Sequence, residues 1–222
     1  MGRKEFFLPT CRLQKGIVYM QLFYTPDHAR VGDVIPYYED GEFKLFYLKN
    51  WNPYFGSDKT LGWHLLTTKD LIHYESETAI GILGGTGCVI KVDGLYHLYY
   101  CVFEDQPQRQ YVCHATSTDL TNWTKYPEET FGPDESIYLL TDWRDPHVIW
   151  NEEEKCWWMI LCAQSQGNTK RRGCVGLCKS ADLHHWTCCE PLYAPQSSMS
   201  AYECPDLFYM NGWWYLVFSQ FT

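Results

Sequence analysis

Short runs of β-branched and aromatic residues follow one another along most of the chain, and Gly, Pro, Asn and Asp separate them. Apolar positions at helical spacing are scarce. Strand-length apolar runs between turn-forming residues are typical of β-structure. The pattern therefore predicts an all-β protein.

One kind of segment, a turn followed by an aromatic-rich strand, occurs four times. The copies cover residues 40–47, 93–100, 154–160 and 211–218. Successive copies are 53, 61 and 57 residues apart, counted from Gly41 through to Gly212. This period suits one four-stranded propeller blade per copy. We predict a β-propeller, with a β-sandwich as the alternative architecture.

A second repeated unit lies between these segments and occurs three times. It consists of a hydroxyl residue, any residue, Asp-Leu, two further residues and an aromatic residue, and its copies are 68–74, 117–123 and 180–186. The aspartates at the third position are expected to close turns, because Asp accepts hydrogen bonds from nearby backbone N–H groups. The final aromatic residue of each unit is expected to pack between blades.

The fourth aromatic strand, residues 213–218, is followed by only four residues. A propeller closes its ring to bury the flat faces of its terminal blades. We therefore expect residues 1–222 to form a single, partial propeller domain with fewer than four complete blades. Its open blade edges predict self-association.

Composition narrows the class of partner. The chain has 222 residues, 45% of them hydrophobic, and no apolar run near twenty residues, which excludes a disordered chain and a membrane-spanning helix. A formal charge of −9 argues against nucleic acid and anionic membranes as partners. The aromatic content of 17% is a weak indication of carbohydrate binding, since flat rings suit sugar faces.

Eleven cysteines are scattered along the chain without a C-x-x-C pair, so a zinc ribbon or a thioredoxin-type motif is not expected. The first residues, 1–9, lack the apolar core of a signal peptide. We therefore expect free thiols and a cytoplasmic protein.

Three carboxylates, Asp33, Asp145 and Glu203, stand a few residues upstream of the first, third and fourth aromatic strands. The innermost strands of propeller blades converge on a central funnel, so residues at one phase of the repeat meet there. Clustered carboxylates suit glycoside cleavage, with one attacking or activating water, one protonating the leaving oxygen and one holding the sugar. A simple turn role explains any one of them, but their shared phase favours a site.

The segments 143–146, Trp-Arg-Asp-Pro, and 202–208, Tyr-Glu-Cys-Pro-Asp-Leu-Phe, resemble glycoside hydrolase family 32 when taken with Asp33. This is the β-fructofuranosidase, levanase and inulinase group, whose five-bladed propeller is usually followed by a β-sandwich, a domain expected to be absent here. The resemblance implies that Asp33 is the nucleophile, Asp145 the transition-state stabiliser and Glu203 the general acid/base. It also implies that Arg144 orients Asp145 or a sugar oxygen, with no metal or organic cofactor.

Two departures weaken the match around the substrate. Residues 30–35 keep only the Asp of the family's Trp-Met-Asn-Asp-Pro-Asn motif, and Leu48 stands where a Gln is usual. An inverting arabinosidase or xylosidase similar to family 43 therefore stays open, as does a non-catalytic carbohydrate-binding fragment. Carboxyl groups about 5–5.5 Å apart would indicate retention, and a gap of about 6.5–9.5 Å would indicate inversion.

Four further residues are candidates for sugar contacts. Trp51, Trp63 and His64 follow the first inner strand, where family members place sugar-contacting aromatics, and core packing is an equal alternative. Thr86 lies in a glycine-rich turn before the second aromatic strand, where its hydroxyl can reach a sugar hydroxyl.

Overall fold

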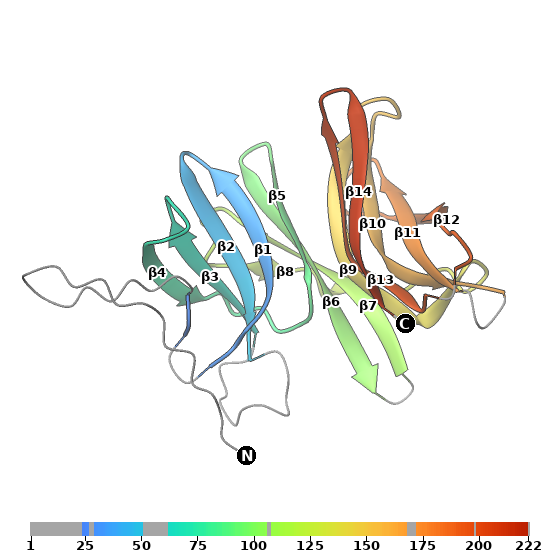
Figure 1. Cartoon of the computed structure of the whole chain (residues 1–222), viewed down its shortest axis with the longest axis horizontal. Coiled ribbons are helices and arrows are strands. Elements are labelled where there is room, and N and C mark those ends of the chain that lie inside the picture. The colour runs from blue at the N-terminus through green and yellow to red at the C-terminus, as the bar shows by residue number, and fades with distance from the viewer. Residues whose placement is uncertain are drawn as a thin grey trace, which may run out of the picture.

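The computed structural model describes residues 24–26, 29–50, 62–105, 108–167, 172–197 and 199–221. These residues form three antiparallel sheets of four strands and one of two strands (Figure 1). The strands are β1 (Val31–Glu39), β2 (Glu42–Lys49), β3 (Gly62–Thr68) and β4 (Tyr74–Ala79); β5 (Gly87–Val92), β6 (Leu95–Asp105), β7 (Gln108–Ser117) and β8 (Thr124–Lys125); β9 (Tyr138–Asn151), β10 (Cys156–Ser165), β11 (Gly173–Ser180) and β12 (Thr187–Tyr193); and β13 (Ala201–Met210) and β14 (Trp213–Phe221). A short 3-10 helix, η2, spans Pro127–Glu129.

Each sheet is a meander whose strands pair in chain order. The strands β1, β5, β9 and β13 begin their sheets, and along the chain each contacts the next. This arrangement is that of propeller blades around an axis. The predicted all-β fold of propeller type, with fewer than four complete blades, is therefore confirmed.

The first repeat of the sequence forms the hairpin between the first two strands of each sheet. Asp40 and Gly41 join β1 to β2 with φ angles of 53° and 79°. Two successive residues with positive φ make the turn type whose twist matches the flanking strands, and Asp-Gly and Asn-Gly are its preferred sequences. The same geometry recurs at Asp93–Gly94 and at Asn211–Gly212.

The second repeat forms the turn between the third and fourth strands of a sheet, and we call it the wedge turn (residues 68–74, 117–123 and 180–186). In the second copy, Ser117 Oγ accepts hydrogen bonds from the backbone N–H groups of Asp119 (3.1 Å) and Leu120 (2.9 Å). Asp119 Oδ1 accepts from those of Thr121 (2.9 Å) and Asn122 (2.8 Å). The predicted turn-closing role of the aspartates is confirmed.

Wedge turns also hold neighbouring sheets together. Trp123 packs against Phe46 of the first sheet, with ring centroids 6.3 Å apart. In the next copy, Trp186 packs edge-on against Tyr99 of the second sheet at 5.6 Å, and the Tyr99 hydroxyl donates to Leu183 O at 2.7 Å. The predicted packing of these two tryptophans between blades is confirmed.

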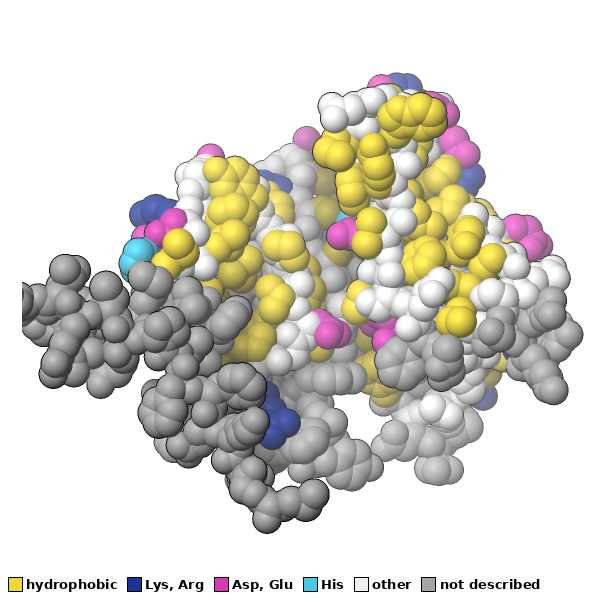
Figure 2. Space-filling view, in the orientation of Figure 1, with side chains coloured by type: hydrophobic (Ala, Val, Ile, Leu, Met, Phe, Trp, Pro, Cys, Tyr) yellow, Lys and Arg dark blue, Asp and Glu magenta, His cyan; other side chains and the backbone are white. Residues whose placement is uncertain are grey.

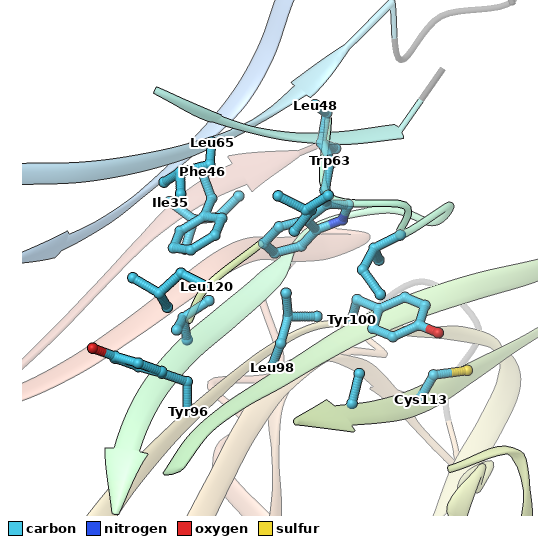
Figure 3. Packing of buried hydrophobic residues seen from close by; sticks show 14 residues of the cluster. Ile35, Phe46, Leu48, Trp63, Leu65, Tyr96, Leu98, Tyr100, Cys113 and Leu120 are labelled. Atoms are coloured by element: carbon cyan, nitrogen blue, oxygen red, sulfur yellow. The ribbon is translucent and has the colours of Figure 1, made fainter. Parts of the chain in front are cut away.

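The hydrophobic core lies between sheets rather than inside one layer. Figure 3 shows the cluster where the first and second sheets meet, with Phe46 and Trp63 from one side facing Leu98 and Tyr100 from the other. Two further clusters fill the second and third interfaces. Because each sheet packs against the next along the chain, the positions of the inner strands are fixed by this packing.

A hollow remains between the first sheet and the fourth, and acidic side chains lie within it (Figure 2). The described residues contain no helix long and apolar enough to span a membrane.

Candidate active site

The predicted carboxylates lie at bulges of three inner strands. Relative to its hydrogen-bonded neighbour, each strand carries one extra residue: between Val31 and Val34 in β1, between Arg144 and His147 in β9, and between Glu203 and Asp206 in β13. We count positions from the residue at which each bulge begins, which is Val31, Arg144 or Glu203. On this count Asp33 is the third residue of its bulge, Asp145 the second and Glu203 the first. Bulges bend a strand and redirect its side chains, and they are common beside active sites.

A hydrogen bond connects the bulges of β9 and β13. Asp145 and Cys204 are equivalent positions of β9 and β13, and both adopt left-handed backbone with φ of 57° and 48°. The Cys204 backbone N–H donates to Asp145 Oδ2 at 3.0 Å. A non-glycine residue at positive φ costs free energy that the surrounding structure must supply. Here the hydrogen bond and the adjoining sheets hold it.

Arg144 joins the acidic groups. Its Nη2 donates to Glu203 Oε1 at 2.8 Å, its Nη1 donates to the Asp142 carboxylate, and its Nε lies 3.9 Å from Asp145 Oδ2. The Arg144 side chain is 15% exposed. A planar guanidinium with several fixed donors orients carboxylates better than a point charge. Arg144 lies beside Asp145, and its expected orienting role stays a prediction.

Thr86 lies on the opposite side of the site, in the equivalent region of the second sheet. Its buried hydroxyl donates a hydrogen bond to Asp33 Oδ2. Asp33 itself is exposed and lines the cavity described below. Thr86 thus holds the Asp33 carboxylate, which the family resemblance implies is the nucleophile.

A cavity of about 180 Å³ opens where the four inner strands meet. Its walls come from residues Asp33–Pro36 on β1, Thr86–Ile90 on and before β5, Asp145–Val148 on β9 and Cys204–Asp206 on β13. The structure thus brings Asp33, Thr86 and Asp145 to one cavity. Glu203 adjoins its wall, held by Arg144.

Burial and neighbouring charges shift the pKa of Asp145. Burial raises the pKa of Asp145 to about 6, against the opposing effects of the Cys204 N–H and the Arg144 charge. The negative charges of Glu203 and Asp33 raise this pKa further. The Asp145 carboxyl therefore lies within electrostatic reach of both Glu203 and Asp33.

Comparison with known proteins gives the family. The sequence model of the "Glycosyl hydrolases family 32 N-terminal domain" matches residues 34–220. The chain belongs to glycoside hydrolase family 32. The resemblance in the sequence is thereby confirmed.

Several proteins are similar to this family 32 chain. A sucrose-6-phosphate hydrolase of Escherichia coli is 28% identical over 188 residues, which cover 77% of this chain and 36% of that protein. A levanase of Bacillus subtilis is 28% identical over 206 residues, covering 85% of this chain and 28% of that protein. The chain therefore spans about a third of the length of these relatives.

Solved structures of family 32 enzymes superpose on this chain. The family 32 β-fructofuranosidase of Bombyx mori superposes with a TM-score of 0.64 at 25% identity, covering 87% of this chain and 43% of that chain. The sucrose-6-phosphate hydrolase of Lactobacillus gasseri gives a TM-score of 0.68 at 22% identity, covering 85% and 40%, which supports the fold.

Two of the remaining candidates, Trp63 and His64, do not line the cavity. Trp63 is 1% exposed, and its Nε1 donates to Gly85 O at 3.0 Å, so it packs in the core. His64 is buried with Nδ1 3.0 Å from Glu77 Oε1. Trp51 lies outside the described residues. A sugar contact by any of them stays a prediction.

The structure adds a pair that the sequence analysis did not single out. His147 Nδ1 lies 2.8 Å from Asp206 Oδ1, and both residues line the cavity. They occupy equivalent positions of β9 and β13, each directly after a bulge proline. Aligning Arg-Asp-Pro-His with Glu-Cys-Pro-Asp reveals this equivalence in the sequence. The pair ties the two bulges together.

Proposed function

We propose that this chain supplies the catalytic site of a β-fructosidase, which cleaves sucrose- or fructan-type β-fructosides with retention of configuration. The observation that carries the proposal is that Asp33 and Asp145 line one cavity, while Arg144 links Asp145 to Glu203 beside it, all at the bulges of three inner strands. Names of similar family members support the substrate class, since they are sucrose-6-phosphate hydrolases, levanases and β-fructofuranosidases.

In the first step, Asp33 attacks the anomeric carbon of the fructosyl unit while the Glu203 carboxyl gives its proton to the leaving oxygen. The glycosidic bond breaks as a fructosyl ester of Asp33 forms. Water then attacks the same carbon and loses a proton to Glu203, which frees Asp33 and returns Glu203 to its acid form. Asp145 accepts hydrogen bonds from fructosyl hydroxyls as positive charge develops. These steps require no metal or organic cofactor.

The surrounding contacts serve these roles. Because Thr86 occupies Asp33 Oδ2, the second oxygen is left to attack. Arg144 fixes Glu203 Oε1 and lies beside Asp145, so both carboxylates keep their direction. The cavity, about 180 Å³, is smaller than the pockets of about 300–1,000 Å³ that hold drug-sized ligands, and it suits one monosaccharide unit.

The two alternatives are not favoured. The similar proteins named above act on sucrose phosphate, levan or fructofuranosides by their names, which speaks against an arabinosidase or xylosidase. A non-catalytic fragment has no need of an arginine-linked set of carboxylates at a cavity.

We extend the proposal to the whole chain. Residues 1–222 belong to one propeller domain, its partner is a carbohydrate, and it works in the cytoplasm. The ten cysteines in the described part of the chain are free thiols, which suits a reducing compartment. The exposed apolar side chains of β13 and β14 support self-association of the isolated chain.

The test is a substrate panel of sucrose, sucrose 6-phosphate, inulin, levan and aryl arabinosides and xylosides, read as sugar release and, in parallel, as binding. We expect hydrolysis of fructosides, and a loss of about 10²–10⁴-fold in Glu203→Gln, the size of a general acid/base contribution. Glu190→Gln, an exposed carboxylate on β12, is the matched control and should keep full activity.

The other outcomes are distinct. Binding of fructosides without hydrolysis would favour the non-catalytic alternative. Hydrolysis of arabinosides or xylosides with inversion would favour the family 43-like one. Neither binding nor hydrolysis of any fructoside would refute the proposed function.

A further inference from the structure

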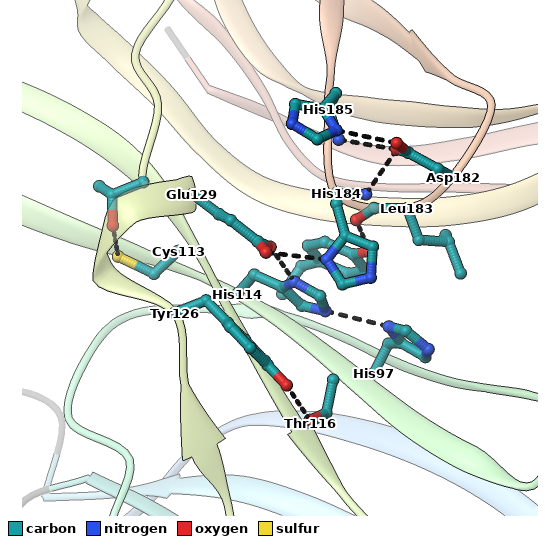
Figure 4. A network of polar contacts seen from close by, with 12 residues as sticks. His97, Cys113, His114, Thr116, Tyr126, Glu129, Asp182, Leu183, His184 and His185 are labelled. Carbon is teal, nitrogen blue, oxygen red and sulfur yellow. Dashed lines mark hydrogen bonds and ion pairs between the residues drawn. The ribbon is translucent and has the colours of Figure 1, made fainter.

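A second cluster of polar groups lies between the second and third sheets (Figure 4). His114 comes from β7, Glu129 from η2 and His184 from the third wedge turn. Glu129 lies between the two imidazoles, with Oε2 2.6 Å from His114 Nδ1 and Oε1 2.8 Å from His184 Nδ1. One ligand atom from each of the three residues lies within 4.8 Å of the other two.

The cluster is rigid on its buried side. The His114 side chain is 3% exposed, and its ring stacks on Tyr99 at 4.5 Å and on Tyr126 at 5.3 Å. His114 Nε2 lies 3.0 Å from His97 Nδ1. A histidine that binds metal through one nitrogen commonly has its other nitrogen fixed by such a partner.

The cluster is open on the side of His184, whose side chain is 37% exposed. The two other wedge turns place Ile72 and Thr121 at this position, so the turn itself does not require histidine. Hydrogen bonds from the backbone N–H groups of His184 (2.9 Å) and His185 (2.8 Å) to Asp182 Oδ1 hold the turn in place. This third copy therefore presents a ligand where the other copies do not.

We propose that His114, Glu129 and His184 bind a divalent transition-metal ion of the zinc class that links the second sheet to the third. Two imidazole nitrogens and one carboxylate oxygen form a ligand set typical of zinc, with a fourth position left for water on the exposed side. Zinc–ligand distances of about 2.0–2.2 Å require only small outward shifts of the three ligand atoms from their hydrogen-bonded positions.

The protons can be accounted for. A neutral imidazole carries one N–H, so metal binding at Nδ1 leaves the proton on Nε2. For His114, that Nε2–H donates to His97 Nδ1, which already lies at hydrogen-bond distance, and the proton of the neutral His97 is then on its Nε2. On binding, the Nδ1–H contacts with Glu129 are replaced by metal bonds.

The site is separate from the catalytic one. His114 stands on the third strand of its sheet, and none of the three ligands lines the cavity between the inner strands. The role inferred for the ion is to stabilise the interface between sheets, and it takes no part in fructoside cleavage. The inference thus stands or falls independently of the proposed function.

The test compares zinc binding and thermal unfolding in the wild-type chain, His184→Thr and His185→Asn, after removal of bound metal with a chelator and in the presence of a non-thiol reductant. The first variant introduces the residue of the second wedge turn, and the second does the same at the exposed neighbouring position, so both preserve the turn. We expect wild type and His185→Asn to bind one zinc per chain and to gain thermal stability. His184→Thr should bind at least about 10-fold more weakly.

Equal zinc affinity in His184→Thr and wild type would overturn the proposal, because binding would then come from other groups such as thiols. Absence of zinc binding by a folded wild-type chain would overturn it as well, leaving the cluster as a hydrogen-bonded network.

Discussion

Asp145 shows most clearly how the site's chemistry arises from one residue's surroundings. Asp145 is 7% exposed, and its carboxyl interacts with the Arg144 charge, the Cys204 N–H and two further carboxylates. Burial and like charges favour the protonated acid, and the arginine and the N–H favour the carboxylate. The net result is a pKa raised to about 6.

This raised pKa predicts a pH-dependent contribution to stability. Because the folded state holds the Asp145 proton more tightly than the unfolded state, with its ordinary value of 3.8, this contribution is present below about pH 4 and is lost as pH rises to about 6. A pKa shift from 3.8 to about 6 corresponds to about 3 kcal/mol in the free energy of unfolding. Asp145→Asn should therefore gain stability relative to wild type between pH 4 and pH 7.

Urea unfolding of both proteins at several pH values measures the difference, and comparing the two removes the titration of groups that do not interact with Asp145. A difference in unfolding free energy that stays constant across this range would contradict the assigned pKa.

At this scale the sequence identified the chemical groups but not their contacts. Asp145, Glu203 and Arg144 were predictable because short motifs carry them, and Asp33 was predictable from its place ahead of the first aromatic strand. The bond from the Cys204 N–H to Asp145 and the pairing of His147 with Asp206 depend on bulges. Aligning the two motifs shows that these positions are equivalent, but it does not show which side chains touch. Trp63 was ambiguous because an aromatic residue after an inner strand suits the core and a sugar equally.

At the scale of elements, the two sequence repeats correspond to two structural devices. The Asp-Gly or Asn-Gly hairpin fixes the register of the first two strands of a sheet. The wedge turn closes the third and fourth strands, and its second and third copies insert Leu and Trp against the preceding sheet. Both were readable from the sequence because local hydrogen bonds and positive φ angles restrict the residue types. The inner-strand bulges carry no such local signature.

The wedge turn gives a stability prediction. Ser117 is buried and accepts two backbone N–H groups, one of them from Leu120 in the core between sheets. Ser117→Ala leaves these donors without that acceptor, which should destabilise the protein by about 1–3 kcal/mol.

Chemical unfolding measures the loss. Ser76→Ala, on the exposed strand β4, serves as the control and should change stability by less than about 0.5 kcal/mol. Equal stability of Ser117→Ala and wild type would show that the turn is held by Asp119 and packing alone.

At the scale of the whole molecule, the sheets bury their faces against their neighbours, and the last one keeps much apolar surface exposed. Trp213 is 71% exposed and Val217 55%, and Figure 2 shows apolar side chains over β14. Exposed patches of this kind favour association. The period and number of the sequence repeats predicted this exposed surface. The zinc-type cluster between sheets could be found only in the structure, because His114, Glu129 and His184 are distant in the sequence.

Self-association through this surface is testable by light scattering of the 222-residue chain. We expect a concentration-dependent mass above that of the monomer, and a lower mass when Trp213 and Val217 are both replaced by Lys. Leu83→Lys, an equally exposed apolar residue elsewhere, should have no effect. A monomeric wild-type chain at all concentrations would refute the prediction.

The central claim is that the carboxylates of three inner-strand bulges form one β-fructosidase site. The most direct measurement is the initial rate of fructose release from inulin by the wild-type chain and by Asp33→Asn, with thermal unfolding confirming that both are folded. The account predicts release by wild type and a loss of at least about 10³-fold in the variant, because no fructosyl ester can form. Equal rates for the two folded proteins would contradict it.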